Sequence, residues 1–115
     1  MHRTDPAKIV LVSGGFDPAH VGHILMLQAA AVMGHVYVAL NSDAWLRHKK
    51  GYVFMPWHER AELLLECRSV LAVVQVDDSD DTVCHALEMI RPDIFANGGD
   101  RTKPNKKEHA LCQRL

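Results

Sequence analysis

Apolar residues occur along this chain in two alternating patterns: short unbroken runs, and longer stretches with helical spacing. The short runs are rich in branched side chains, which predicts buried parallel strands over residues 9–12, 35–40, 70–76 and 93–96. The longer stretches predict helices over residues 21–33, 44–48, 57–67, 82–90 and 105–115. Because strands and helices alternate, we expect a parallel sheet joined by right-handed crossovers.

Residues that begin or end helices stand at the boundaries of these segments. Gly34 follows the first predicted helix as a stop signal, and Pro56 suits the start of the third. A chain of 115 residues is long enough to bury one core and is typical of one domain. We therefore predict a single α/β domain over residues 1–115, a Rossmann-like doubly wound parallel sheet in three α/β/α layers.

Loops that follow three of the predicted strands carry most of the candidate chemistry. They cover residues 13–20, 41–51 and 97–104. In a parallel sheet such loops share one edge, and that edge holds the ligand crevice of doubly wound folds. The sequence therefore predicts a ligand site at the carboxyl edge of the sheet.

The first of these loops has the composition of a phosphate site. Residues 13–23 read SGGFDPAHVGH and join a predicted strand to a predicted helix. The glycines let the backbone approach a phosphate, and the helix start offers unpaired N–H groups. His20 and His23 lie three residues apart, so they share one helix face and both can point at one phosphate. In the alternative interpretation they only cap the helix or pack in the turn.

The pattern Gly-x-Phe-Asp-x-x-His-x-Gly-His resembles the signature of the nucleotidyltransferase superfamily that includes the cytidylyltransferases. The resemblance implies transfer of CMP or AMP from CTP or ATP to a small phosphorylated metabolite, a sugar phosphate or glycerol 3-phosphate, with release of pyrophosphate. By the same resemblance, His20 and His23 stabilise the α-phosphate and the departing pyrophosphate. The implied nucleotide-binding residues of this loop are Ser13, Gly14, Gly15, Phe16, Asp17 and Gly22. Asp17 either orients the turn or caps the helix by accepting backbone N–H bonds.

The second loop carries a further resemblance. Residues 38–43, VALNSD, followed by Lys50-Gly51, resemble the matching stretch of the sugar-phosphate adenylyltransferases, notably the heptose-1-phosphate enzymes. Glycerol-3-phosphate cytidylyltransferases are similar there but vary more. The resemblance implies that Lys50 reaches the phosphates, with Arg47 or Lys49 assisting. The implied substrate-binding residues are Asn41, Asp43, Arg47 and Lys49.

Arg60, near a predicted helix start, matches a family arginine that meets a phosphate, and it joins His20, His23 and Lys50 as a candidate catalytic residue. The alternative for Arg60 is a helix-surface ion pair with Glu62 or Glu66. For the Lys49-Lys50 pair the alternative is a solvated surface.

The third loop resembles the family's strand that ends in Gly-Gly-Asp. The implied nucleotide-binding residues here are Asn97, Gly98, Gly99 and Asp100. Asn97 stands where many relatives carry lysine, and Arg101 is the candidate replacement for that charge. The family's second motif, a basic residue followed by a Ser/Thr-rich turn, has no counterpart after Asp100. Either the sequence is shortened or this member does without the motif.

Charge and composition exclude several classes of function. The formal net charge is −1 with eight neutral histidines, which argues against a general nucleic-acid partner. It also argues against the RNA-linked role of class I aminoacyl-tRNA synthetases, which share a related histidine motif. No apolar run reaches membrane-span length, and the polar N-terminus gives no secretion signal, so we expect a cytoplasmic protein without a membrane partner.

The spacing of His, Cys and acidic residues predicts no dedicated protein metal site. Mg²⁺ is expected to arrive with the triphosphate instead. We expect the acidic run, Asp77, Asp78, Asp80 and Asp81, to be a solvated loop and helix cap. Family members often form homodimers, and Trp45 or Trp57 could serve such an interface or the core.

Two functions from different classes follow. The first is an enzyme, a nucleotidyltransferase, and the alternative is a catalytically impaired nucleotide-binding domain without the second phosphate-binding motif. The base stays open, because the Asn-Ser-Asp and Gly-Gly-Asp stretches resemble those of the heptose-type adenylyltransferases, whereas the short length resembles that of the glycerol-phosphate cytidylyltransferases.

Overall fold

The computed structural model describes residues 8–97 and 106–115 of the chain. The strands are β1 (Ile9–Gly14), β2 (His35–Leu40), β3 (Val70–Gln75) and β4 (Ile94–Asn97). The helices are α1 (Val21–Met33), α2 (Asp43–Lys50), α3 (Trp57–Leu65), α4 (Cys84–Ile90) and α5 (Lys106–Arg114). Every predicted strand and helix is present, and its ends lie within about two residues of the expected ones, as is usual for element boundaries.

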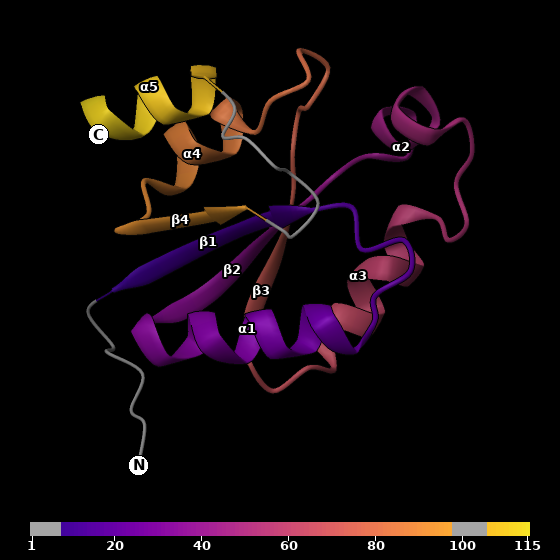
Figure 1. The fold of residues 1–115 in the computed structure, drawn as a ribbon, viewed down its shortest axis with the longest axis horizontal. Coiled ribbons are helices and arrows are strands. Elements are labelled where there is room, and N and C mark those ends of the chain that lie inside the picture. Colours follow the sequence, from indigo (N-terminus) through magenta and orange to yellow (C-terminus); the bar gives the residue numbers. More distant parts are fainter. Residues whose placement is uncertain (1–7, 98–105) are drawn as a thin grey trace.

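The strands form one parallel sheet in the order β3-β2-β1-β4. Helices α1 and α3 cover one face, α4 and α5 cover the other, and α2 lies beyond the carboxyl edge (Figure 1). The predicted doubly wound, three-layer α/β/α fold is therefore confirmed. The chain leaves β1 toward β2 on one side and later reaches β4 on the other, so the strand order reverses between β1 and β4. Doubly wound folds bind ligands outside the strand ends at such a switch point.

Alternate residues of β1 face two separate cores. Val10 and Val12 pack with Leu27 of α1, whereas Leu11 packs with Leu87 of α4, and all five residues are fully buried. Burying a side chain of this size is worth roughly 1.5–3 kcal/mol. Because β1 is held from both faces, its carboxyl end is a rigid base for the loop that follows.

Gly34 does end α1, but not as a left-handed cap. Its φ is 169°, extended backbone that any residue can adopt. A Cβ at this position would lie 2.8 Å from the carbonyl oxygen of Lys8, and the next amide, His35 N–H, donates to that oxygen at 3.0 Å. Glycine is needed here because the chain entering β2 passes close to the start of β1.

Helix α4 begins at Cys84, two residues later than predicted, and a side chain of another helix caps its N-terminus. The N-cap residue Val83 has no side-chain acceptor. Glu108 of α5, which is 1% exposed, accepts the Val83 N–H at 2.8 Å instead. A carboxylate at a helix N-terminus is favoured by both hydrogen bonding and the helix dipole. This contact joins the two helices of the upper layer.

Both tryptophans are half-buried and donate hydrogen bonds within the chain. Trp57 packs against the core below the sheet and donates from Nε1 to the carbonyl of Leu40 at 3.1 Å. Trp45 donates from Nε1 to Asp81 Oδ1 at 2.7 Å. The homodimer stays a prediction. Among the helices of the described residues, none has the length and apolar character needed to cross a membrane.

Candidate functional site

The first loop places two histidines at the start of α1, where each caps the helix. His20 is the N-cap residue, and its Nδ1 accepts the Gly22 N–H at 3.1 Å. His23 completes a capping box, because its Nδ1 accepts the His20 N–H at 3.1 Å. The two rings stack with centroids 3.9 Å apart. The capping that the sequence left as an alternative is therefore present, and it fixes how both rings lie.

The same hydrogen bonds assign the tautomer of both rings. A ring nitrogen that accepts a backbone N–H carries no proton, so each neutral imidazole holds its proton on Nε2. Each ring is thus an Nε2–H donor at a helix N-terminus, where backbone N–H groups and the helix dipole also favour an anion. His20 is exposed and His23 is 9% exposed.

Glycine at position 22 makes room for the His20 ring. A Cβ on Gly22 would lie 2.9 Å from His20 Cε1 and 3.1 Å from its Nδ1, so a larger residue would push the imidazole from its cap. Phe16 supports the other ring, with its centroid 4.7 Å from that of His23. Phe16 has a φ of 49°, rare for an aromatic residue, and a Cβ on Gly14 would meet its ring at 2.9 Å. Gly14, Gly22 and Phe16 together shape the histidine pair.

Asp17 ties the first loop to the segment before α3. Its side chain is 1% exposed and accepts the Phe54 N–H at 2.8 Å and the Met55 N–H at 2.6 Å. Lys50 Nζ lies 2.8 Å from Asp17 Oδ2 and donates to the Asp17 carbonyl at 2.8 Å. Burial opposes ionisation, but hydrogen bonds from Lys50 and both amides outweigh it and lower the pKa of Asp17. Of the two roles that the sequence left open for Asp17, capping of α1 is wrong, since His20 is the N-cap residue.

Lys50 comes to this edge at the end of α2. Its Nζ also lies 4.6 Å from the ring centroid of Tyr52, a cation–π distance. The predicted substrate-binding residues Arg47 and Lys49 are exposed on the same helix, and Lys49 Nζ lies 5.9 Å from the Trp45 ring. Lys50 is thus brought beside the first loop, and Arg47 and Lys49 lie on the exposed surface of α2.

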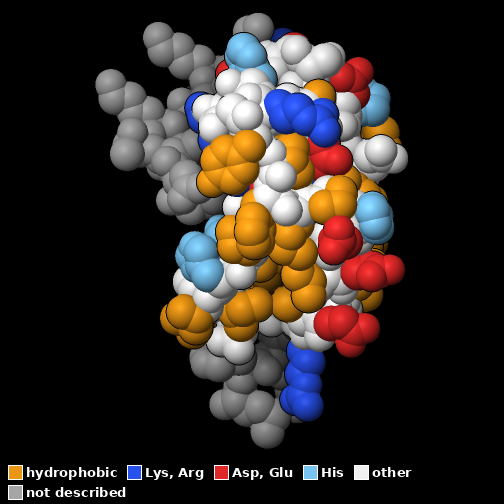
Figure 2. All heavy atoms as spheres, turned by 90° about the vertical axis from the view of Figure 1, so that its right-hand side faces the viewer, with side chains coloured by type: hydrophobic (Ala, Val, Ile, Leu, Met, Phe, Trp, Pro, Cys, Tyr) orange, Lys and Arg blue, Asp and Glu red, His pale blue; other side chains and the backbone are white. Residues whose placement is uncertain are grey.

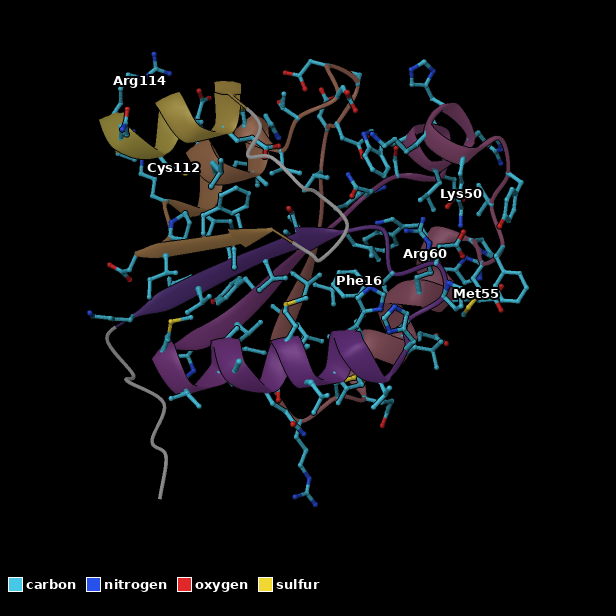
Figure 3. All side chains as sticks on the ribbon, viewed as in Figure 1. Phe16, Lys50, Met55, Arg60, Cys112 and Arg114 are labelled. Atoms are coloured by element: carbon cyan, nitrogen blue, oxygen red, sulfur yellow. The ribbon has the colours of Figure 1, made fainter. Side chains whose placement is uncertain are left out.

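Arg60 of α3 is 1% exposed and donates to acceptors from three loops. Its Nε donates to the Met55 carbonyl at 2.9 Å, and its Nη1 to the carbonyls of Gly15 and Asn41, each at 2.8 Å. Its Nη2 lies 2.7 Å from Asp43 Oδ1. The alternative of a surface ion pair with Glu62 or Glu66 is wrong, because Arg60 points inward to Asp43. Figure 3 shows Phe16, Lys50, Met55 and Arg60 gathered at this edge of the molecule.

Asp78, in the loop after β3, is a member of the site that sequence reasoning missed. It is 5% exposed and accepts from Asn41 Nδ2 at 3.0 Å, from the Ser42 N–H at 2.9 Å and from Ser42 Oγ at 2.7 Å. The expectation of a solvated acidic loop holds for Asp77, Asp80 and Asp81, which are exposed, and is wrong for Asp78. The signal in the sequence that could have identified Asp78 was its position after a predicted strand, at the carboxyl edge of the sheet.

The third predicted loop is only partly described. Asn97 ends β4 and lies opposite Ser13 of β1 in the sheet register, so the first and third loops leave adjacent strands. Gly98, Gly99 and Asp100 lie outside the described residues. Over residues 8–97 and 106–115, no cluster of three or more His, Cys, Asp or Glu side chains could hold a metal ion.

The exposed face at this edge carries apolar side chains as well as charged ones. Figure 2 views this edge of the molecule and shows histidine side chains next to hydrophobic ones, with Lys or Arg side chains above them and Asp or Glu side chains along the right-hand side. Exposed apolar side chains come from the start of α1, Val21, and from the segment before α3, Tyr52 and Phe54. The edge therefore offers cations and donors for phosphates beside apolar surface.

A model of the cytidylyltransferase-like family matches residues 11–112, which include every described element of this site. The chain belongs to the cytidylyltransferase-like family. This confirms the predicted membership of the HxGH nucleotidyltransferase superfamily.

Relatives of known name support the same assignment. The chain is 39% identical over 97 residues to the bifunctional protein HldE of Syntrophotalea carbinolica, covering 82% of this chain and 19% of the relative. It is 40% identical over 98 residues to HldE of Geobacter metallireducens, covering 83% and 20%. The chain thus spans about a fifth of the length of these relatives.

Among solved structures, the fold is similar to a lipopolysaccharide core biosynthesis protein from Thermoplasma volcanium. The TM-score is 0.81 at 21% identity, over 93% of this chain and 87% of the other. At this identity the likeness bears on the fold alone, and it agrees with the doubly wound architecture described above.

Proposed function

We propose that this domain transfers CMP or AMP from CTP or ATP to a small phosphorylated metabolite and releases pyrophosphate. The observation that carries the proposal is the capped pair His20 and His23 at the start of α1, beside the switch point between β1 and β4. Both rings lie at the helix N-terminus with Nδ1 accepting a backbone N–H, which leaves the ring proton on Nε2, and N–H donors at a helix N-terminus are the chemistry that a triphosphate needs. Family membership supports the same reaction type.

In nucleotidyl transfer, the main roles of the protein are to position the reactants and to stabilise charge. Attack on the α-phosphorus adds charge to its equatorial oxygens and to the leaving pyrophosphate. His20 and His23 donate to these oxygens in the proposed mechanism, and the cation of Lys50 balances the growing charge. A phosphate monoester acceptor is largely ionised near pH 7, so it attacks without a protein nucleophile or strong base. The triphosphate brings its own Mg²⁺ as part of the substrate.

Some of the candidate substrate-binding side chains of the second loop already bond to other residues of the protein. The side chains of Asn41 and Asp43 already bind Asp78 and Arg60, so the exposed Arg47 and Lys49 of α2 are better placed to meet an incoming phosphate. We assign the acceptor phosphate to these two residues. A sugar phosphate or glycerol 3-phosphate carries the single small anionic group that such a surface would bind.

The proposal is tested by titrating ATP and CTP, each with Mg²⁺, into the wild-type domain and a His20→Ala/His23→Ala variant. Pyrophosphate release is then measured with glycerol 3-phosphate and with sugar 1-phosphates. We expect one triphosphate to bind, the double variant to lose that binding, and one acceptor to give pyrophosphate.

A matched control is His85→Ala, which removes an exposed histidine from α4 on the opposite face of the sheet. It should bind and turn over as wild type does. Triphosphate binding without pyrophosphate release for any acceptor would instead indicate the catalytically impaired nucleotide-binding domain. Equal binding by the double variant and wild type would remove the histidine site from the mechanism.

A further inference from the structure

The guanidinium of Arg60 sits beneath the loops of the site rather than on its surface. We infer that Arg60 is a positioning residue, which, paired with Asp43, fixes the first loop relative to the second, and that it does not bind a phosphate. The inference deepens the proposed function, since it says how that reaction's phosphate site keeps its geometry.

Four of the five N–H donors of Arg60 already bond to protein oxygens. A guanidinium has five N–H groups, and four contacts to protein oxygens between 2.7 and 2.9 Å use its three nitrogens. Its side chain is fully buried, whereas that of Asp43 is 30% exposed. To reach a bound phosphate, Arg60 would have to leave three backbone carbonyls without their donor and expose Asp43 without its cation. Buried acceptors stripped of their partners are costly, so the observed arrangement is the stable one.

Each carbonyl that Arg60 holds belongs to a segment that shapes the histidine pair. Gly15 directly precedes Phe16, whose ring packs on His23. Met55 carries one of the two amides that bind Asp17, three residues before His20. Asn41 donates its backbone N–H to the Gly14 carbonyl at 3.0 Å. One buried cation thus connects the loop after β1, the loop after β2 and the segment before α3.

A residue in such a position affects the rate more than the binding. Misplacing reacting groups by about 1 Å can cost roughly 10²-fold in rate. Losing a direct phosphate contact would instead weaken triphosphate binding by roughly tenfold or more, since a charge-assisted hydrogen bond is worth about 1.5–3 kcal/mol. The ratio of the change in kcat to the change in Kd therefore separates the two roles.

Two substitutions test the inference. Arg60→Lys keeps the charge but replaces the three-nitrogen fork with one nitrogen. Asp43→Asn keeps an acceptor oxygen but removes the neutralising charge, so it carries the test if Arg60→Lys does not fold. For each we expect kcat to fall roughly 10²-fold, while Kd for the triphosphate changes by less than about threefold. The control Arg68→Lys makes the same exchange at an exposed arginine between α3 and β3 and should stay within about twofold of wild type.

Amide hydrogen exchange gives a readout that needs no activity. In the wild type the amides of Phe54, Met55 and Asn41 are held by acceptors in the first loop. Loosening the loops should speed exchange of these three amides by about tenfold or more. The Leu87 amide, bonded to Val83 in the opposite layer, should keep its wild-type rate.

Unchanged exchange at the three amides, or a rise of Kd of about tenfold with kcat preserved, overturns the positioning role. If the wild-type domain transfers no nucleotide at all, the proposed function fails, and the exchange rates still decide whether Arg60 holds the loops. Faster exchange confined to these amides supports the inference in either case.

Discussion

Two polar groups lie at the carboxyl edge, and they differ in what surrounds them. The histidine group is the pair His20 and His23, which caps α1; His20 is exposed and His23 is 9% exposed. The arginine group is Arg60 with Asp43, together with Asp78, and its hydrogen bonds join three loops. For each of these residues except Asp78, the sequence predicts phosphate or substrate binding.

The difference shows that polar side chains at strand ends can have two different roles. Donors at the surface can meet a ligand, whereas buried donors must be satisfied by the protein itself. In the described residues every buried side-chain nitrogen or oxygen has a hydrogen-bond partner. We therefore expect changes in the histidine group, which includes the exposed His20, to affect activity, and changes in the arginine group to affect stability or geometry.

The largest expected effect is on turnover, and it comes from a change in the histidine group. His20→Ala should lower kcat by roughly 10²–10³-fold, the usual result of removing one charge-stabilising donor. Its effect on stability should stay near the ~1 kcal/mol of a lost N-cap. Pyrophosphate release and urea unfolding on the same preparation measure both quantities. Turnover within a factor of two of wild type would contradict the ligand-facing role.

A change in the arginine group should affect stability more than turnover. Asp78→Ala leaves Asn41 Nδ2 and the Ser42 N–H without their acceptor, which should cost about 1–3 kcal/mol for each donor that water cannot reach. Urea unfolding measures the loss. The matched control Asp80→Ala removes an exposed carboxylate of the same loop that bonds only to Thr82 in the hydrogen bonds described. Equal destabilisation by both substitutions would mean that burial of Asp78 matters little.

A smaller effect tests whether ring orientation matters apart from the histidine itself. Gly22→Ala places a methyl group about where the His20 ring now lies. We expect turnover to fall roughly tenfold, because the ring must leave its cap, with a stability change below ~1 kcal/mol. Kinetics at saturating triphosphate measure it. Unchanged turnover would show that His20 acts equally well from another rotamer.

The smallest effect is a pH dependence of stability. The pKa of Asp17 is lowered in the folded state, so its ionised form stabilises the fold above its ordinary value of 3.8, and that contribution is lost as pH falls toward the lowered pKa. The free energy of unfolding of the wild type should therefore approach that of Asp17→Asn as pH falls below about 4. Urea unfolding between pH 3 and pH 6 measures the gap between the two free energies. A gap that does not narrow at low pH would mean that ionisation of Asp17 is not what holds the loop.

Much of the fold was predictable because its signals are local. The branched run at residues 9–12 and the helical spacing of residues 21–33 need only near neighbours to specify a strand and a helix. Glycines and prolines then placed the boundaries to within a residue or two. The phosphate loop was predictable for the same reason, since SGGFDPAHVGH is one continuous segment. Its family was confirmed over residues 11–112.

The roles of Asp17, Arg60 and Asp78 were not predictable, because their partners lie far along the chain. Asp17 binds an amide 38 residues away, Arg60 a carbonyl 45 residues away, and Asp78 an amide 37 residues away. Tertiary packing at the carboxyl edge brings these segments together.

The sequence by itself determined the alternating elements, the doubly wound sheet and the histidine loop at its carboxyl edge. The tertiary structure alone decided which polar residues face outward and which are buried beneath them. The physical reason is that local periodicity specifies a strand or a helix, whereas burial depends on packing between distant segments.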